Sequence, residues 1–175
     1  MTTAIDPPAA TRTGERADLL AALGKARHFL RSTVRDLTDE QAASRPTVSE
    51  LCLGGLIKHV AETEDAWVDF ILTGPSAMER GTDGETHAWT FQMLPGETLA
   101  GLLARYDAVA RRTNELVASL LDLDSSQPLP EAPWFVKGSR WSARLVILHV
   151  IAETSQHAGH ADIIRETIDG AKTMG

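Results

Sequence analysis

Four long stretches of this chain place apolar residues three and four positions apart, the spacing that gathers them on one face of an α-helix. These stretches run from about Arg16 to Leu37, from about Leu53 to Leu72, from Leu99 to Leu120 and from Ser142 to Asp169. No segment alternates apolar and polar residues for long enough to form a central strand. Because four amphipathic helices can bury their apolar faces against one another, the sequence predicts an all-α protein built as a four-helix bundle.

Local signals predict where several helices begin and end. Thr38 and Gln41 have the spacing of a capping box, so a short helical turn is expected there. Three further boundaries are marked by capping residues: Gly74-Pro75 after the second helix, Ser142 before the fourth and Gly170 after it. Gly54-Gly55 falls near the start of the second helix, where two glycines carry a cost in helix propensity.

The composition is that of a globular domain. At 175 residues, with 43% hydrophobic and 23% charged residues, the chain is long enough to bury one core. We expect a flexible leader over residues 1–14 and a single domain over residues 15–175. The net charge of −7, with no cluster of Lys and Arg to offset it, argues against a nucleic-acid partner.

The chain carries no sign of a membrane or secretory protein. No apolar run approaches the roughly 20 residues of a membrane span. The first fifteen residues lack the apolar segment of a signal peptide. A single cysteine, Cys52, excludes an internal disulfide, so a cytoplasmic protein is expected. Cys52 is interpreted as a small buried side chain in preference to a nucleophile.

The fourth stretch carries the sequence Glu153-Thr-Ser-Gln-His157-Ala-Gly-His160, which places metal-ligating side chains on one side of a helix. At about 100° per residue, Glu153 and His157 lie one turn apart, with His160 between them in angle and His149 on the other side. Imidazole and carboxylate groups at this spacing can converge on one divalent ion such as Zn, Ni, Co, Mn or Fe(II). The alternative is a solvated polar face, which the apolar neighbours of these residues make less favourable.

A catalytic metal needs a further ligand from another element. His59 of the second stretch is a candidate, although a lone His among apolar neighbours is more often part of the core. In a bundle, however, a residue of the second helix can face the last helix, and bundle cores are where such metal sites are built.

Two segments carry a resemblance to a known family: Leu53-Gly-Gly-Leu-Ile-Lys-His59-Val-Ala-Glu62, and the last stretch from Leu148 to Glu166. Together with a long third helix they resemble the DinB-like superfamily, and most closely its mini-circle-protein branch, related to mycothiol- and bacillithiol-dependent transferases. The resemblance spans about Leu19 to Gly170. It implies an up-up-down-down four-helix bundle that holds a divalent metal with one His from the second helix and two residues from the last helix.

Within this resemblance, His59 matches the second-helix ligand and His157 the later residue of the last-helix pair. Glu153 falls on the earlier position, where many members have His and the mycothiol-dependent maleylpyruvate isomerases have Glu. His160 is the alternative third ligand. If Glu153 is the ligand, His160 becomes a catalytic pocket residue that orients a ligand or moves a proton. His149 then has either a similar role or a neutral role in the core.

The resemblance implies that a low-molecular-weight thiol, with mycothiol expected, is joined to a small electrophile or serves a thiol-dependent isomerisation. Zn is the expected metal, and Ni, Mn, Co and Fe suit the same ligands. The loop from Leu123 to Arg140 carries Trp134 and Phe135, and Trp141 follows it directly; these aromatic residues either pack on an apolar electrophile or fill the core. Two other functions stay open: a metal hydrolase or lyase, and a non-catalytic bundle that binds metal or a small ligand. A homodimer is a further possibility.

Overall fold

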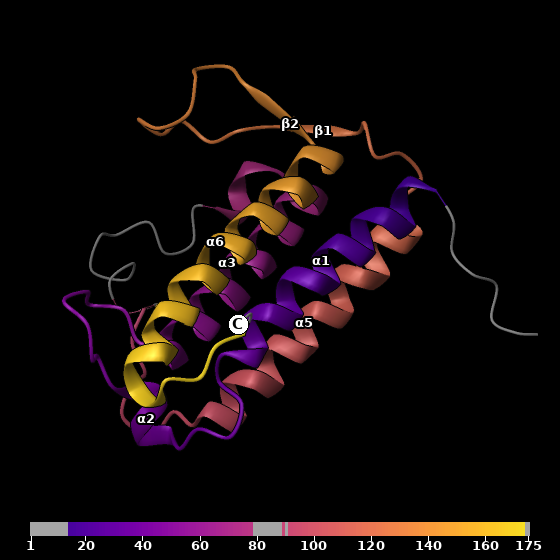
Figure 1. Cartoon of the computed structure of the whole chain (residues 1–175). Coiled ribbons are helices and arrows are strands. Elements are labelled where there is room, and N and C mark those ends of the chain that lie inside the picture. The colour runs from indigo at the N-terminus through magenta and orange to yellow at the C-terminus, as the bar shows by residue number, and fades with distance from the viewer. Residues whose placement is uncertain (1–13, 79–88, 90, 174–175) are drawn as a thin grey trace, which may run out of the picture.

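Four long helices form the body of the protein in the computed structural model, which describes residues 14–78, 89 and 91–173 (Figure 1). The long helices are α1 (Glu15–Ser32), α3 (Leu53–Thr73), α5 (Leu99–Ser119) and α6 (Ala143–Asp169). Shorter elements are α2 (Asp39–Ala43), the 3-10 turn η1 (Pro75–Ala77) and the antiparallel strands β1 (Ser126–Pro128) and β2 (Arg140–Ser142). The predicted all-α four-helix bundle is therefore confirmed.

The helix ends agree closely with the capping signals. Thr38 and Gln41 form both bonds of the capping box at the start of α2. The Ser142 hydroxyl accepts a hydrogen bond from the Leu145 amide at the start of α6, and Gly170 ends that helix with a left-handed backbone at φ 77°. The first helix is shorter than its apolar pattern suggested, because the chain turns after Ser32 and Asp36 takes a positive φ of 60°.

The helices run up, down, down and up, so the up-up-down-down order implied by the family resemblance is wrong. Helices α1 and α6 are parallel neighbours (Figure 1). At one end Arg144 of α6 pairs with Glu15 of α1, and at the other end Arg165 donates a 2.9 Å hydrogen bond to the Thr33 carbonyl.

Helices α3 and α5 are also parallel to each other, and both are antiparallel to α6. Arg105 of α5 pairs with Glu62 of α3, and two turns further along each helix Arg112 pairs with Asp69. The reason lies in the helix ends: α3 ends at one end of the bundle and α5 begins at the other, where the Leu99 amide donates to Asp39 of α2, whereas an up-up-down-down order needs two such crossings of the bundle. Apolar periodicity identifies helices without giving their direction.

In the described part of the chain, the core contains three apolar clusters and a buried polar group centred on Glu64. Glu64 of α3 is fully buried and bonds to Arg27 of α1 and Thr113 of α5. A buried carboxylate is tolerated only when it is paired in this way, so the group ties three helices together at a fixed register.

Two expectations concern parts of the chain outside the bundle. Residues 1–13 of the expected N-terminal leader lie outside the described residues, and Gly14 precedes α1. The loop after α5 contains the small β1–β2 hairpin, whose strands are too short to show an alternating pattern. None of the helices in the described part of the chain has the length and apolar character needed to cross a membrane.

Candidate metal centre

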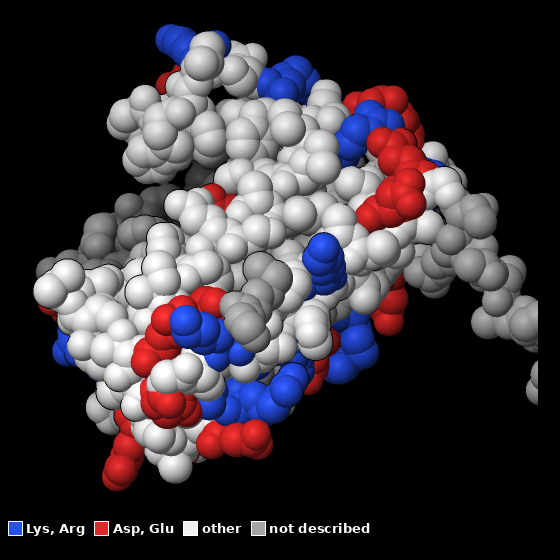
Figure 2. Space-filling model, viewed as in Figure 1, with Lys and Arg blue, Asp and Glu red and all other residues white. Residues whose placement is uncertain are grey.

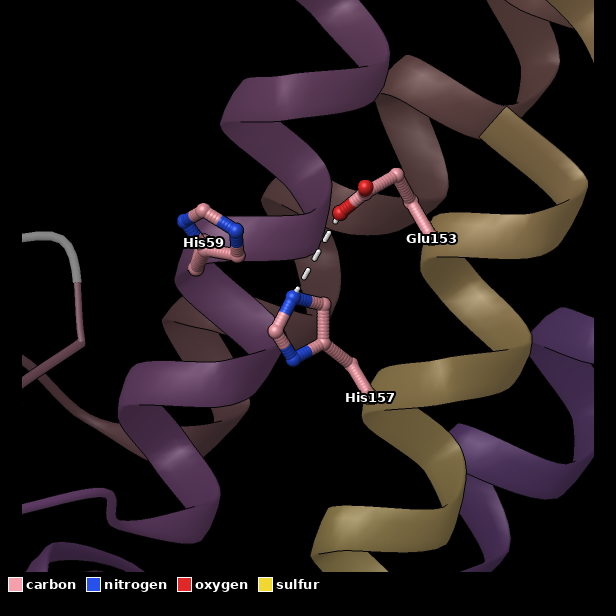
Figure 3. A group of neighbouring side chains, drawn as sticks. All are labelled: His59, Glu153 and His157. Carbon is pink, nitrogen blue, oxygen red and sulfur yellow. Dashed lines mark ion pairs between the residues drawn. The ribbon is translucent and has the colours of Figure 1, made fainter. Parts of the chain in front are cut away.

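Three side chains from two helices meet between α3 and α6 (Figure 3). His59 projects from α3, and Glu153 and His157 project from successive turns of α6. One potential ligand atom from each residue lies within 4.8 Å of the other two. His59 and His157 are buried and Glu153 is half-buried, so the group opens to solvent on the Glu153 side.

The antiparallel packing of α3 and α6 is what brings these residues face to face. The rings of His59 and His157 are 4.8 Å apart, and Trp67 of α3 packs on His149 of α6 at 4.9 Å. The step of eight residues along both helices, in opposite directions, shows that the two axes stay side by side through the site. The ligands of α6 then follow from i, i+4 spacing alone.

His59 is held by a residue far away in sequence. Phe91 stacks on its ring with centroids 4.0 Å apart and an interplanar angle of 25°. On the same helix, the Thr63 hydroxyl lies 3.5 Å from His59 Nε2. Because Phe91 covers one face of the His59 ring and Thr63 lies beside one of its nitrogens, the ring has few orientations available. It is therefore preorganised as a potential metal ligand.

The glycine pair of α3 makes the approach of Phe91 possible. A Cβ on Gly55 would lie 1.9 Å from the Phe91 carbonyl oxygen, and a Cβ on Gly54 would lie 2.1 Å from Met93 Sδ. No side chain larger than hydrogen fits at Gly55 unless the crossover backbone moves. Cys52, the N-cap of α3, adds a contact from its Sγ to the Phe91 carbonyl at 3.6 Å. The cost of two glycines in a helix is thus explained by close packing.

A partly buried ion pair anchors the same segment one residue from His59. Lys58 Nζ lies 3.0 Å from Glu97 Oε2, and the Leu94 amide donates to that carboxylate at 2.7 Å. Burial alone would raise the pKa of Glu97, but these two donors hold its pKa below the ordinary value. Residues 91–97 are therefore held against α3 both at Phe91 and at Glu97.

On α6, the Glu153 carboxylate lies between two imidazoles. Its Oε2 is 3.6 Å from His157 Nε2 and its Oε1 is 3.9 Å from His149 Nε2. Burial lowers the pKa of His157 and of His149 below the usual histidine value, although Glu153 opposes this shift in both. Burial therefore favours the neutral form of each ring, the form in which a nitrogen lone pair can bind a metal.

His160 lies on the other side of the His157 ring. Its Nδ1 is 3.5 Å from His157 Nδ1, whereas Nε2 of His157 is the nitrogen that faces Glu153. A group at Nδ1 selects the tautomer that leaves Nε2 free to accept a metal. Among the described residues, the cluster of potential ligands contains Glu153 and leaves His160 out.

A cavity of about 380 Å³ opens beside the cluster. Besides the three potential ligands, it is lined by Thr63, Phe91, His149 and Gln156. Thr63, Phe91 and Gln156 were not anticipated from the sequence. The glycine pair could have indicated that another segment presses on α3 there, but nothing in the sequence named Phe91. A larger hollow of about 540 Å³, between the end of α1 and the start of α5, lies away from the cluster.

The aromatic residues of the loop after α5 have different environments. Trp141 stacks on Trp67 at 4.9 Å and packs against His149 at 5.0 Å, so it fills the core next to the site. Phe135 packs on Trp141 at 5.8 Å. Trp134 is 76% exposed. Cys52 is buried, as the sequence interpretation expected.

The donor set suits a divalent transition metal. Two neutral imidazoles and one carboxylate leave positions free for small molecules at Zn or at a metal of similar preference. Ligand atoms of a tetrahedral Zn site are about 3.3 Å apart, given metal–ligand bonds of about 2.0–2.1 Å. Separations within 4.8 Å can close to that value through small side-chain rotations, since both helices already hold the side chains face to face.

Fold and site together define a helical bundle with a potential two-histidine, one-carboxylate centre between its second and last long helices. A sequence model of the mycothiol S-transferase family matches residues 18–170, and the chain belongs to this DinB-like family. The structure is similar to that of a conserved protein from Enterococcus faecalis, with a TM-score of 0.69 and 13% sequence identity over 91% of this chain and 100% of that one. At this identity the likeness concerns the fold alone. No curated protein is similar enough in sequence to count as a match.

Proposed function

We propose that this chain is a divalent-metal-dependent thiol S-transferase that joins a low-molecular-weight thiol, with mycothiol as the expected thiol, to a small electrophile. The observation that carries the proposal is the meeting of His59, Glu153 and His157 beside an open cavity, in a chain of the mycothiol S-transferase family. Zinc is the metal that we expect, and nickel, manganese, cobalt or iron would suit the same donors.

A divalent metal held by these residues would lower the pKa of a thiol from its free value of about 8.5, so that a nucleophile is available near neutral pH. In the transfer, a sulfur lone pair forms the new S–C bond while the bond from that carbon to its leaving group breaks. The leaving group departs with the bonding electrons, and the thiol proton passes to water. In a thiol-dependent isomerisation of a conjugated alkene, the sulfur lone pair would form the S–C bond as the C=C π bond opens, and the thiolate would leave again with that bonding pair as the double bond re-forms after rotation.

The residues of the chain have distinct roles in this proposal. His59, Glu153 and His157 hold the metal, and Phe91 keeps the His59 ring in place. His160, for which the sequence suggested a catalytic role, is proposed to act through His157 by fixing its tautomer. The hydroxyl of Thr63 and the amide of Gln156 offer hydrogen bonds to whatever enters the cavity.

The test is a measurement of metal content followed by an assay of thiol consumption. Purified protein should contain about one divalent transition metal per chain. With chlorodinitrobenzene as electrophile, it should consume mycothiol in a saturable manner. Activity should disappear on chelation and return when the metal is added back.

Two controls make this assay specific. Omitting the thiol distinguishes a transferase from a hydrolase, which would turn over without thiol by using water. His28→Ala, on the exposed face of α1, should keep both metal and activity, whereas His59→Ala should lose both. Turnover that persists in fully metal-free protein would refute the proposal.

The cellular location and the oligomeric state are two further expectations. The lone, buried Cys52 is the basis for the expected cytoplasmic location. A homodimer is the further possibility that the sequence left open, to be checked by sedimentation of the purified chain.

A further inference from the structure

The segment between the two strands forms an arm that projects beyond the helical body (Figures 1 and 2). We call residues 129–139 the hairpin arm. It is internally bonded, because the Leu129 amide donates to the Ser139 carbonyl at 2.9 Å and the Ser139 amide donates to the Val136 carbonyl at 3.0 Å. A cavity of about 260 Å³ lies within the arm. The arm is thus an ordered element with a concave surface.

A row of ring contacts leads from the candidate metal centre to this arm. His149, whose Nε2 faces Glu153, packs on Trp141 with centroids 5.0 Å apart. Trp141 contacts Phe135 at 5.8 Å, and Phe135 contacts Trp134 at 6.2 Å. The inner rings are fixed by the core, since Trp141 also stacks on Trp67. The outermost ring, Trp134, is 76% exposed although burial would favour so large a side chain.

The arm also carries polar groups suited to a hydroxyl-rich ligand. Glu131 and Lys137 line its cavity, together with apolar groups that include Phe135. Neither side chain has a hydrogen bond or ion pair with another residue in the described part of the chain. Trp134 does not line this cavity itself, but its ring contacts Phe135, which does. An exposed indole on the same arm can pack on the C–H face of a sugar ring while the carboxylate and the ammonium group bond its hydroxyls.

The cavity at the metal centre has an apolar side and a side that connects by ring contacts to the arm. Phe91 lines the cavity with an apolar ring stacked on His59, whereas His149 lines it and packs on Trp141, the ring that contacts Phe135 of the arm. A substrate composed of a reactive thiol and a long polar body therefore fits with its sulfur at the centre and its body toward the arm. A compact apolar electrophile fits better at the Phe91 end.

We propose that the hairpin arm is the binding subsite for the carbohydrate part of a glycosylated thiol, with Trp134 as the stacking surface and Glu131 and Lys137 as hydrogen-bonding groups. Mycothiol, in which a cysteine derivative is attached to an amino sugar and an inositol, has this chemistry. The inference rests on the proposed function for the choice of ligand. It differs from both alternatives of the sequence analysis, in which these aromatic residues either pack on an apolar electrophile or fill the core.

The experiment measures binding separately from turnover. S-methyl mycothiol keeps the sugars but cannot transfer its sulfur, and its dissociation constant for the metal-loaded protein can be measured by calorimetry. Trp134→Ala should weaken this binding about tenfold, the effect of losing one good aromatic contact. The matched control is Val136→Ala, an equally exposed position on the same arm, which should change the binding less than about twofold.

Steady-state kinetics with chlorodinitrobenzene provide the second readout. Trp134→Ala should raise KM for mycothiol while leaving its kcat, the KM for the electrophile and all constants for N-acetylcysteine, which lacks the sugars, unchanged. An increase in the KM for the electrophile instead would overturn the assignment in favour of an electrophile site. A change in oligomeric state with unchanged binding would show that the arm contacts a second copy of the chain.

The outcomes also separate this inference from the proposed function. Trp134-dependent binding of S-methyl mycothiol without any transfer activity would uphold the arm and refute the transferase. Transfer of mycothiol that is indifferent to Trp134, Glu131→Gln and Lys137→Met would refute the arm and uphold the transferase.

Discussion

Replacing Glu153 and His160 side by side tests which of them completes the metal centre. Glu153→Gln keeps the shape of the side chain and removes its charge and most of its strength as a ligand. His160→Ala removes a ring that lies 3.5 Å from Nδ1 of His157 on the side away from Glu153. If the ligands are His59, Glu153 and His157, the first change removes a ligand and the second removes only a support.

The two changes should differ in size. A complete structural Zn site is worth about 10–16 kcal/mol, so one ligand of three accounts for about 3–5 kcal/mol. That is a loss of two to four orders of magnitude in metal affinity for Glu153→Gln. Groups that only orient a ligand typically contribute about 10–100-fold to metal affinity. His160→Ala should therefore lower metal affinity by about 100-fold at most, which is the smallest loss expected for Glu153→Gln. His59→Ala and His157→Ala should resemble Glu153→Gln.

Competition with a chromophoric chelator gives the affinities of all variants under identical conditions. His28→Ala serves as the histidine control, because His28 is exposed on α1 and should leave metal affinity unchanged. Circular dichroism should show equal helical content for every variant. A His160→Ala protein that loses metal more readily than Glu153→Gln would refute the assignment and favour a site of His59, His157 and His160.

Three further results are expected. Chelation should abolish activity and leave the far-UV helical signal in place, because the long helices bury an apolar core without the ion; unfolding on chelation would show a structural metal. Gly55→Ala should destabilise the protein by about 1–3 kcal/mol in urea unfolding because its Cβ meets the Phe91 carbonyl, whereas Gly24→Ala, an open position in α1, should stabilise it by about 0.5–1 kcal/mol; equal effects would refute the packing argument. Since the folded pKa of Glu97 lies below its unfolded value of about 4.3, its contribution to stability is present above that pH and is lost as pH falls through the folded pKa. Glu97→Gln should therefore lower stability at neutral pH and reduce the loss on acidification, as urea midpoints at about pH 7 and about pH 3 would show.

Much of the fold could be predicted from the sequence because helices can be recognised from patterns of neighbouring residues. Apolar spacing located all four long helices, and capping residues such as Thr38, Ser142 and Gly170 fixed several ends. Helix direction could not be obtained in this way, since an amphipathic stretch has the same pattern whichever way it runs. That information lies in contacts between distant residues, such as Arg165 with the Thr33 carbonyl.

The candidate site divides in the same manner. Glu153 and His157 belong to one helix, so their proximity follows from helical geometry. His59 joins them only because α3 packs antiparallel to α6, and the resemblance to a family supplied that pairing where periodicity could not. Neither helical periodicity nor the family resemblance predicted Phe91, because its position depends on a contact with α3 that is distant in sequence.

The crossover therefore has as much influence on the centre as the motif of α6. Two potential ligands are secured by one helix, but the orientation of His59 depends on the Phe91 ring packed against it. That packing depends in turn on the absence of a side chain at Gly55 and on the Lys58–Glu97 ion pair next to it. A chain with the same α6 motif and a larger residue at the position of Gly55 would have to move its crossover. Its second-helix histidine would then lose the support that confines it, even though all three potential ligands remained in the sequence.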